Sequence, residues 1–250
     1  MLTQREAKLL TVHLSKTQID RLGDRLREGA ITDSDLKLLD DYRRSFGDAY
    51  DTVVRIIREQ LQLKPTGRPA KSTTSLIEKL QRESIRLSQV QDIAGCRVVL
   101  ADVVEQERVV ASLHELFPKA SLMDRRVKPS YGYRAVHIMA RVSGKLIEIQ
   151  VRSPLQHLWA ELSEKFSDII DPSIKYGGGD EQIRQMLTQL SALVADFEEV
   201  EIGIAHPPKQ QIPDSELEQS RQKWFRLKER IADHLNKMIS WVENQKGQKP

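Results

Sequence analysis

The chain has 250 residues, of which 39 are Lys or Arg and 36 are Asp or Glu, so its formal net charge is +3 with neutral histidines. With 39% hydrophobic and 30% charged residues, the composition indicates a folded globular protein and excludes a wholly disordered chain. No run of 18 apolar residues and no apolar leader segment is present, so we expect a cytoplasmic protein without a membrane partner. The single cysteine, Cys96, excludes an internal disulfide and a multi-cysteine metal site.

The near-neutral total charge says little about partners, but the basic residues are clustered. Residues 64–86 carry six basic and two acidic side chains, and residues 221–250 carry eight basic and three acidic ones. Residues 125–134 carry four basic and no acidic side chains. Such runs are usually solvated faces, and the alternative is that they converge on a polyphosphate or an RNA backbone.

Helical periodicity dominates the first third of the sequence. Apolar residues recur at helical spacing over 36–42 and again over 50–61. Two prolines and a glycine in residues 64–69 predict that the second helix ends near residue 63. A short helix over 73–81 follows.

The middle third has the alternation and β-branched composition of strands. We predict a short strand over 96–100, a helix over 103–117 and a weak strand over 122–127. The strongest strands, 134–142 and 145–152, are joined by a two-residue Ser-Gly turn that predicts a hairpin.

Alternation along the last strand places two kinds of side chain on opposite faces. One face carries isoleucines and a valine, and the other carries Glu148, Gln150 and Arg152. A carboxylate in mid-strand marks either a functional site or the exposed face of an edge strand, and the strand alone leaves both open. Asp92, just before the first strand, is likewise either a functional group or a loop cap.

The last third is helical again. Ser153 to Gln156 form a capping box with proline at the first helical position, which predicts a helix over 155–166. A second helix is predicted over 180–203, a linker over 206–213 and a last helix over 215–244.

Two patterns indicate chemistry. Asp92 and Glu148, converging at strand ends, would make a hard-oxygen site of the kind that Mg²⁺ prefers. The Lys71 to Ser75 segment, which enters a helix, offers hydroxyls, backbone N–H groups and a positive dipole end to an anion, and Lys79 adds a charge.

These residues resemble the synthetase domain of RelA/SpoT proteins. The resemblance lies in residues 92–97, 128–137 and 148–152, and in an upstream ATP segment over 67–80. It covers residues 66–165 with the motifs in the family's order. It implies transfer of the β,γ-pyrophosphate of ATP to the ribose 3′-hydroxyl of a nucleotide. It also implies an α+β fold with a mixed five-stranded sheet flanked by helices, similar to nucleotidyltransferases.

The resemblance also implies roles for individual residues. Mg²⁺ is the expected cofactor, and the catalytic and metal-binding residues are Asp92 and Glu148. The expected ATP-binding residues, with two arginines sandwiching adenine, are Arg68, Lys71, Ser75, Lys79 and Arg97. The expected acceptor-binding residues are Lys128, Tyr133, Arg134, His137, Gln150, Arg152 and His157.

The chain departs from the family pattern in ways that leave the acceptor open. The ATP segment (68–71) and the acceptor loop (130–133) each have one residue more than is usual, and His157 stands where the family usually has Asn or Asp to read guanine. The main prediction is synthesis of guanosine tetra- or pentaphosphate from ATP and GDP or GTP. The alternatives are a toxin that pyrophosphorylates the 3′ end of tRNA or makes adenosine alarmones, and a non-catalytic nucleotide- or RNA-binding regulator.

The chain divides into three expected segments: a helical one (1–64), the RelA/SpoT-like core (65–179) and the C-terminal helices (180–250). The last helix has an apolar stripe that we expect to pack on the core or on another subunit. A homo-oligomer and an antitoxin protein therefore stay open as partners, beside ATP, GDP or GTP, and tRNA.

Overall fold

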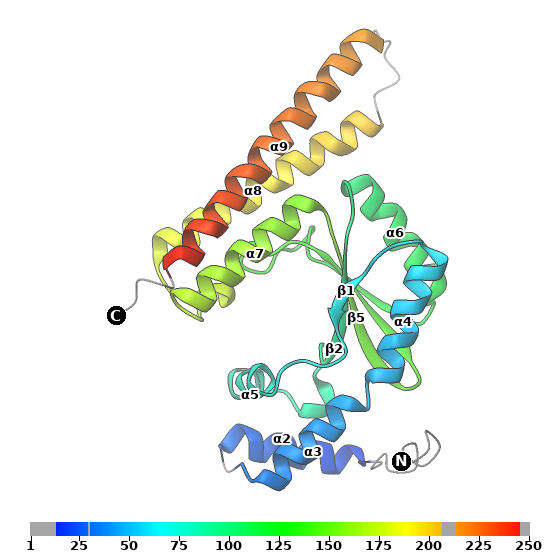
Figure 1. Ribbon diagram of the computed structural model, residues 1–250, viewed down its shortest axis with the longest axis vertical. Helices are drawn as coiled ribbons and strands as arrows, with labels where there is room; N and C mark the ends of the chain where they lie inside the picture. Colours follow the sequence, from blue (N-terminus) through cyan, green and yellow to red (C-terminus); the bar gives the residue numbers. More distant parts are fainter. Residues whose placement is uncertain (1–13, 30, 207–213, 246–250) are drawn as a thin grey trace. The chain divides into compact units, whose positions relative to one another are not determined.

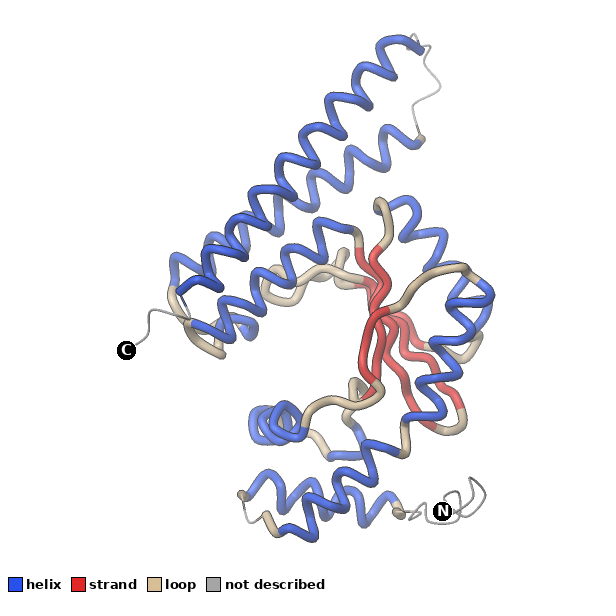
Figure 2. Tube along the Cα trace, viewed as in Figure 1, coloured by secondary structure: helices blue, strands red, loops and turns tan. Residues whose placement is uncertain are grey.

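The computed structural model describes residues 14–29, 31–206 and 214–245. The expected fold class is confirmed: helices flank a five-stranded sheet in the order β1-β2-β5-β4-β3 (Figures 1 and 2). The strands are β1 (Thr66–Arg68), β2 (Ala94–Val99), β3 (Ser121–Asp124), β4 (Val136–Val142) and β5 (Lys145–Arg152). The helices are α2 (Lys16–Glu28), α3 (Asp33–Arg44), α4 (Gly47–Gln60), α5 (Thr73–Arg82), α6 (Val103–Leu116), α7 (Pro154–Ile169), α8 (Glu181–Ala205) and α9 (Asp214–Gln245), with short 3-10 turns at Leu87–Gln89 and Ile174–Tyr176.

The sheet is mixed. β1 pairs antiparallel with β2. β2 and β5 are parallel, since Gly95 lies beside Glu148 and, further along both strands, the Leu100 amide donates to the Arg152 carbonyl at 3.0 Å. β4 and β5 form the predicted hairpin, whose turn residues Ser143 and Gly144 both have positive φ, at 49° and 77°.

The strand β1 was not predicted from the sequence. β1 lies in the segment that we predicted as a helix-ending loop, and all of its residues are exposed. Pro65 and Pro69 flank it, and a three-residue edge strand between prolines leaves no alternation to detect. The predicted linker at 206–213 lies, beyond its first residue, outside the described residues.

β5 is the middle strand of the sheet. Ile147, Ile149 and Val151 are fully buried, whereas Glu148 and Gln150 on the opposite face are half-buried. The reading of Glu148 as decoration of an edge strand is therefore wrong. Cys96 on β2 is buried, and this burial, with the nearby Glu148 charge, raises the pKa of its thiol to about 12.

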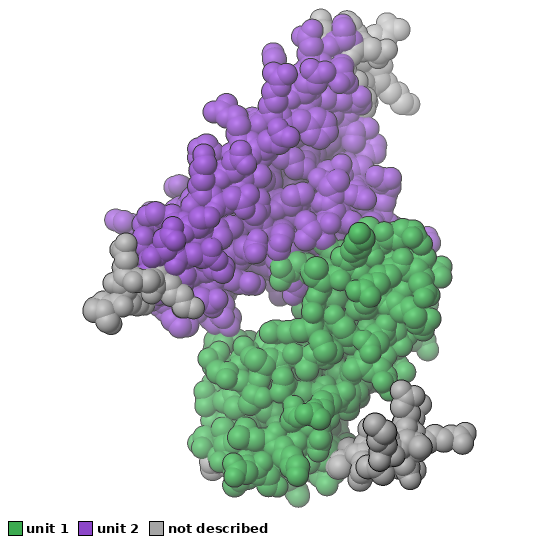
Figure 3. Space-filling view, in the orientation of Figure 1, with its two compact units in different colours: residues 1–98, 117–121, 138–149 green, residues 99–116, 122–137, 150–250 purple. Residues whose placement is uncertain are grey.

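The chain forms two compact units that interleave along the sequence (Figure 3). The first comprises residues 1–98, 117–121 and 138–149, and the second comprises residues 99–116, 122–137 and 150–250. The expected division into three consecutive segments stays a prediction.

In the first unit, capped helices meet the sheet hairpin. Ser15 and Thr32 make capping boxes at the starts of α2 and α3. The Lys145 ammonium donates to the Ser45 hydroxyl at 2.7 Å and lies 4.5 Å from the centre of the Phe46 ring. These contacts hold the β4–β5 turn against the α3–α4 connection.

In the second unit, α7, α8 and α9 share one hydrophobic core. The expected packing of the last helix onto the rest of the chain is confirmed. Leu235 and Val242 of α9 are buried in this core, and the centre of the Trp224 ring lies 4.3 Å from the centre of the Phe197 ring on α8. Trp241 is exposed. Among the described helices, none has the length and apolar composition that crossing a membrane requires.

Gly95 provides a test of this sheet. A Cβ at this position would lie 2.9 Å from the Glu148 carbonyl oxygen and 3.2 Å from its Cβ, so Gly95→Ala should lower the free energy of unfolding by about 1–3 kcal/mol. Gly47→Ala, at the start of α4 with nothing within 4 Å, should change it by less than about 0.5 kcal/mol. Urea unfolding followed by circular dichroism measures both. Equal midpoints would contradict the packing of β2 on β5.

Candidate functional site

The first unit contains a cluster of one carboxylate and two ammonium groups. Lys71 Nζ lies 2.7 Å from Asp92 Oδ2, and Lys79 Nζ lies 2.9 Å from Asp92 Oδ1. The Asp92 side chain is 24% exposed, and those of the lysines are 14% and 20% exposed. Three residues that the sequence assigned to phosphate and metal binding are thus brought together at a partly open surface.

Backbone contacts hold this cluster in place. The Lys71 amide donates to the Ile93 carbonyl at 2.6 Å, which ties the segment before α5 to the residue after Asp92. Arg43 on α3 donates to the Lys71 carbonyl at 2.6 Å and to the Thr73 hydroxyl at 3.0 Å. The backbone of Lys71 is therefore held by contacts that involve neither the Lys71 nor the Lys79 ammonium group.

The electrostatics of Asp92 follow from this arrangement. Burial by itself would raise the pKa of the carboxyl, but the charges and hydrogen bonds of Lys71 and Lys79 outweigh it and lower the pKa to about 2. Asp92 is therefore ionised at neutral pH, with each carboxylate oxygen accepting from one lysine ammonium group.

Ser75 lies in the first turn of α5, where backbone N–H groups and the helix dipole favour anions. Ser72 caps this helix: its hydroxyl accepts from the Ser75 amide at 3.2 Å and donates to the Ser75 hydroxyl at 2.8 Å. The segment predicted to bind phosphate is thus a capped helix start directly after Lys71.

The two predicted adenine-binding arginines lie on one face of the sheet. Arg68 pairs with Gly95 and Thr66 pairs with Arg97, so Arg68 and Arg97 are diagonal neighbours across β1 and β2. Diagonal positions on paired strands are about 7–8 Å apart. Glu148 is on the same face, since its Cβ lies beside the position that a Gly95 Cβ would occupy.

The second unit contains a cluster around a tyrosine hydroxyl. Tyr133 Oη lies 2.7 Å from His137 Nε2 and accepts a hydrogen bond from Arg152 Nη2 at 2.9 Å. The same Nη2 donates to Gln150 Oε1 at 2.9 Å, and the guanidinium carbon lies 5.1 Å from the centre of the Tyr133 ring. Four of the seven predicted acceptor residues are therefore in mutual contact.

A tight turn positions Tyr133. Ser130 and Tyr133 pair across a turn whose central residues, Tyr131 and Gly132, both have positive φ, at 53° and 87°. Two constraints favour glycine at position 132. Its positive φ suits a residue without a side chain, and a Cβ there would lie 2.7 Å from the ring of Trp159. The sequence Tyr-Gly thus supplies a turn of the hairpin type immediately before the predicted base-stacking ring.

Arg152 has the character of an anion-binding group. It is 2% exposed, and its Nε and Nη1 have no hydrogen-bond partner among the described residues. Buried guanidinium donors are normally satisfied, and phosphate oxygens suit their planar geometry. Arg152 therefore has unused donors next to Tyr133, enclosed below the surface.

The remaining predicted acceptor residues lie outside this contact group. Lys128 is exposed in the loop after β3. Arg134 donates to Glu198 Oε2 at 3.1 Å and to the Arg126 carbonyl at 3.0 Å. His157 is half-buried in the first turn of α7, with Nε2 at 3.6 Å from Glu161 Oε2. Their roles at an acceptor site stay predictions.

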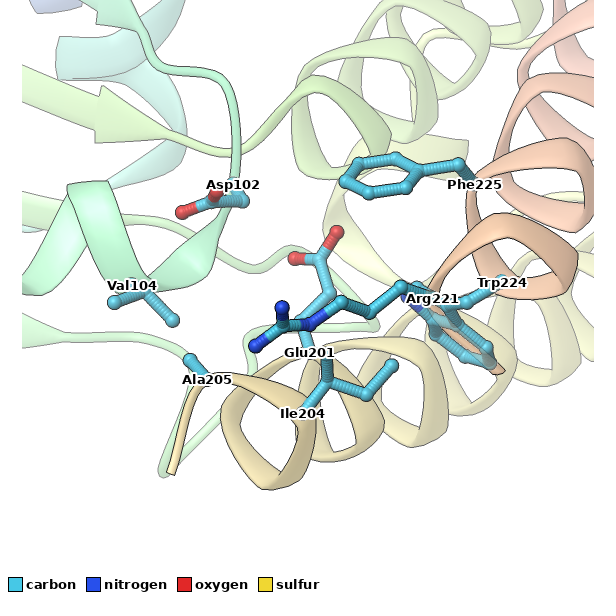
Figure 4. A pocket seen from close by; sticks show the side chains of 8 residues that line it. All are labelled: Asp102, Val104, Glu201, Ile204, Ala205, Arg221, Trp224 and Phe225. Atoms are coloured by element: carbon cyan, nitrogen blue, oxygen red, sulfur yellow. The ribbon is translucent and has the colours of Figure 1, made fainter. Parts of the chain in front are cut away.

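Besides an open hollow of about 570 Å³ that is lined by α9 alone, two further cavities lie in the described part of the second unit. One, of about 140 Å³, is lined by Tyr133 and Trp159 together with Ala160, Ser163, Glu164, Lys175 and Tyr176. The other, of about 210 Å³, is lined by Asp102, Val104, Glu201, Ile204, Ala205, Arg221, Trp224 and Phe225 (Figure 4). Both are smaller than the roughly 300 Å³ typical of ligand pockets, and the second is lined by no predicted site residue. The first adjoins the tyrosine cluster and is the one relevant to it.

Metal binding at this site would depend on few protein ligands. Within the described ranges, no group of three or more His, Cys, Asp or Glu side chains is placed to hold a metal ion. Asp92 and Glu148 are carboxylates of the same unit, and carboxylate oxygens are the donors that a hard cation takes together with water and phosphate.

Residues 67–167 match the model of a family described as the region found in RelA/SpoT proteins. The matched part of this chain is therefore similar to that region, and it is called the RelA/SpoT region below. All fourteen predicted site residues lie inside it, from Arg68 to His157, whereas α8 and α9 lie beyond its end. The resemblance found in the sequence is thereby confirmed.

The proteins similar to this chain include curated sequences and solved structures. Uncharacterized proteins of Mycobacterium tuberculosis and Mycobacterium bovis are 35% identical over 143 residues, which cover 54% of this chain and 52% of theirs. The match therefore spans about half the length of these curated relatives. A crystal structure from Streptococcus mutans UA159 has a TM-score of 0.50 at 25% identity, covering 68% of this chain and 95% of that one. Small alarmone synthetase 1 of Bacillus subtilis, bound to its product pppGpp, has a TM-score of 0.49 at 22% identity, covering 64% and 95%.

One buried carboxylate in contact with a predicted site residue was not among the residues predicted from the sequence. Glu198 on α8 is a buried carboxylate that contacts the start of α7 and Arg134. The available signal was a carboxylate one turn after Val194 on the apolar stripe of a long helix, directly after Phe197.

The Asp92 cluster predicts a pH dependence of stability. Because the folded pKa is lowered to about 2, the ion pairs stabilise the fold fully above the unfolded pKa near 3.8, and this contribution is lost as the pH falls from about 5 to about 2. It amounts to about 2 kcal/mol. Asp92→Asn should therefore be less stable than the wild type at pH 7, and the difference should shrink over this range.

Urea unfolding at a series of pH values measures this, with Asp51→Asn on the exposed face of α4 as the matched control. A constant difference between Asp92→Asn and the wild type at all pH values would contradict the low pKa.

Proposed function

We propose that this chain is a Mg²⁺-dependent pyrophosphotransferase that moves the β,γ-pyrophosphate of ATP to the 3′-hydroxyl of GDP or GTP. The observation that carries the proposal is a RelA/SpoT region with two clusters of complementary chemistry. One, around Asp92, suits nucleotide phosphates with a metal ion, and the other, around Tyr133 and Arg152, suits a base and an anion.

The β1–β2 face suits the adenine of ATP. A ring placed between two planar guanidinium groups needs a separation of about 7–8 Å, twice a stacking distance of about 3.5–4 Å. Diagonal strand positions such as those of Arg68 and Arg97 have about this separation. Arg68 and Arg97 would then stack on the base through cation–π contacts. Lys71, Lys79 and the start of α5 would hold the phosphates.

Asp92 and Glu148 would hold Mg²⁺. The bound ion would neutralise charge on the transferred phosphates. Asp92 is already ionised, and its two lysines are flexible ammonium groups that can contact phosphate oxygens as well as the carboxylate. The charges of this cluster thus match a nucleotide that binds together with its metal ion.

The tyrosine cluster suits the acceptor. His137 and Arg152 fix the Tyr133 hydroxyl, so its ring is held in one orientation for stacking on a base. The unpartnered donors of Arg152 would bind acceptor phosphate after a side-chain movement that exposes them. Glu148 lies two positions before Gln150 on the same face of β5 and would accept the proton of the 3′-hydroxyl.

The reaction forms a bond between the acceptor 3′-oxygen and the β-phosphorus of ATP. The bond from that phosphorus to the bridging α,β oxygen breaks, AMP leaves, and the hydroxyl proton passes to Glu148. Such a transfer depends mainly on alignment and charge neutralisation, and each cluster has charges suited to one of the two substrates.

An acceptor panel tests the proposal. The protein is incubated with γ-labelled ATP, Mg²⁺ and, separately, GDP, GTP, ADP and deacylated tRNA. We expect label in the GDP and GTP products with release of AMP. Label in tRNA or in ADP alone would overturn the guanosine acceptor, and absence of label with every acceptor would overturn the transfer activity.

In the same assay, Glu148→Gln should lower the rate by on the order of 100-fold or more, because a proton acceptor and a metal ligand are lost without a change of volume. Glu59→Gln, exposed on α4, is the matched control and should keep the wild-type rate. A Glu148→Gln protein with near-normal turnover would remove Glu148 from the reaction.

A second pair of variants separates the two substrates. Arg68→Ala should raise the KM for ATP, since a stacked arginine contributes about 0.5–2 kcal/mol. Tyr133→Ala should raise the KM for the acceptor, since base stacking contributes about 1–3 kcal/mol. Steady-state kinetics with each substrate varied in turn measure both effects, with Arg55→Ala as control. The reverse pattern would mean that the ATP and acceptor sites are exchanged.

A further inference from the structure

α8 carries a buried carboxylate that has three partners in the RelA/SpoT region. Glu198 is 4% exposed and lies thirty-one residues beyond the end of that region at residue 167. Its Oε2 accepts from Arg134 at 3.1 Å, and its Oε1 accepts from the Ser153 hydroxyl at 3.0 Å and from the Gln156 amide group at 2.6 Å. All four residues belong to the second unit.

Each partner is adjacent in sequence to a predicted acceptor residue. Arg134 follows Tyr133, the ring proposed to stack on the base. Ser153 follows Arg152, the cation with orphaned donors. Gln156 precedes His157, the residue at the position expected to read the base edge. One carboxylate thus fixes the chain beside three separate acceptor groups.

The network around Glu198 is closed by further buried contacts. Gln106 Nε2 on α6 donates to Gln156 Oε1 at 2.9 Å and to the Val151 carbonyl at 2.8 Å. The Ser153 hydroxyl also caps α7 by accepting a hydrogen bond from the backbone N–H of Gln156. Because an unsatisfied buried polar group is costly, such a network permits few alternative arrangements.

We propose that Glu198 is a positioning residue for acceptor binding, so that α8 is a required part of the acceptor site although it lies outside the RelA/SpoT region. Only the effect on acceptor kinetics rests on the proposed function; the effect on the structure does not. Loss of the carboxylate would leave the half-buried Arg134 guanidinium without its counter-charge and release the start of α7. Tyr133, Arg152 and His157 would then lose a common orientation.

The first test needs no activity. Hydrogen exchange is measured for the wild type, Glu198→Gln and the control Glu199→Gln, which changes the exposed neighbour on the same helix. We expect faster exchange at residues 130–137 and 150–157 in Glu198→Gln alone, with α5 at wild-type rates. Unchanged exchange at both acceptor segments would overturn the proposal.

The second test is kinetic. Glu198→Gln should raise the KM for the acceptor by on the order of 10- to 100-fold, as expected when reacting groups are misplaced, while the KM for ATP stays within about twofold. Equal changes in both KM values would show a purely structural role and overturn the proposal. If Glu198→Gln does not fold, the same comparison of the KM for the acceptor with the KM for ATP is made on Glu198→Asp, which keeps the charge.

Failure of the proposed function would be visible separately, because the wild-type protein would then label no acceptor while the hydrogen-exchange difference at residues 130–137 and 150–157 persisted.

Discussion

The middle strand must carry polar side chains on a half-buried face, and much of the site follows from that constraint. Its period of two sends Ile147, Ile149 and Val151 into the core and leaves Glu148 and Gln150 opposite. A carboxylate and an amide in the centre of a sheet need neighbours that leave room. Gly95 on the adjacent strand leaves that room because it has no Cβ.

Charges near this strand are compensated by specific partners rather than by solvent. Asp92 has two lysines, and Arg134 has a carboxylate that comes from a distant helix. Removing one partner of such a pair costs more than the pair itself contributes, because a buried charge is left alone. Both arginines keep unpartnered donors among the described residues: Nε of Arg134, and Nε and Nη1 of Arg152.

Local patterns in the sequence predicted what local physics determines. The alternation of residues 145–152 and the Ser-Gly turn gave the hairpin, and the capping box at Ser153 gave the start of α7. β1 was missed because three residues between prolines carry no periodicity. Register and long-range pairing were also out of reach: the diagonal of Arg68 and Arg97 and the contact of Arg134 with Glu198 depend on tertiary structure that no local window contains.

The buried thiol of Cys96 has a practical consequence. With its pKa raised to about 12 and its sulfur enclosed in β2, it is almost entirely protonated near neutral pH and reacts slowly with maleimides. It is also the single cysteine of the sequence. A cysteine introduced at an exposed position would therefore take up a fluorophore alone, and the native chain already serves as the unlabelled background for such optical experiments.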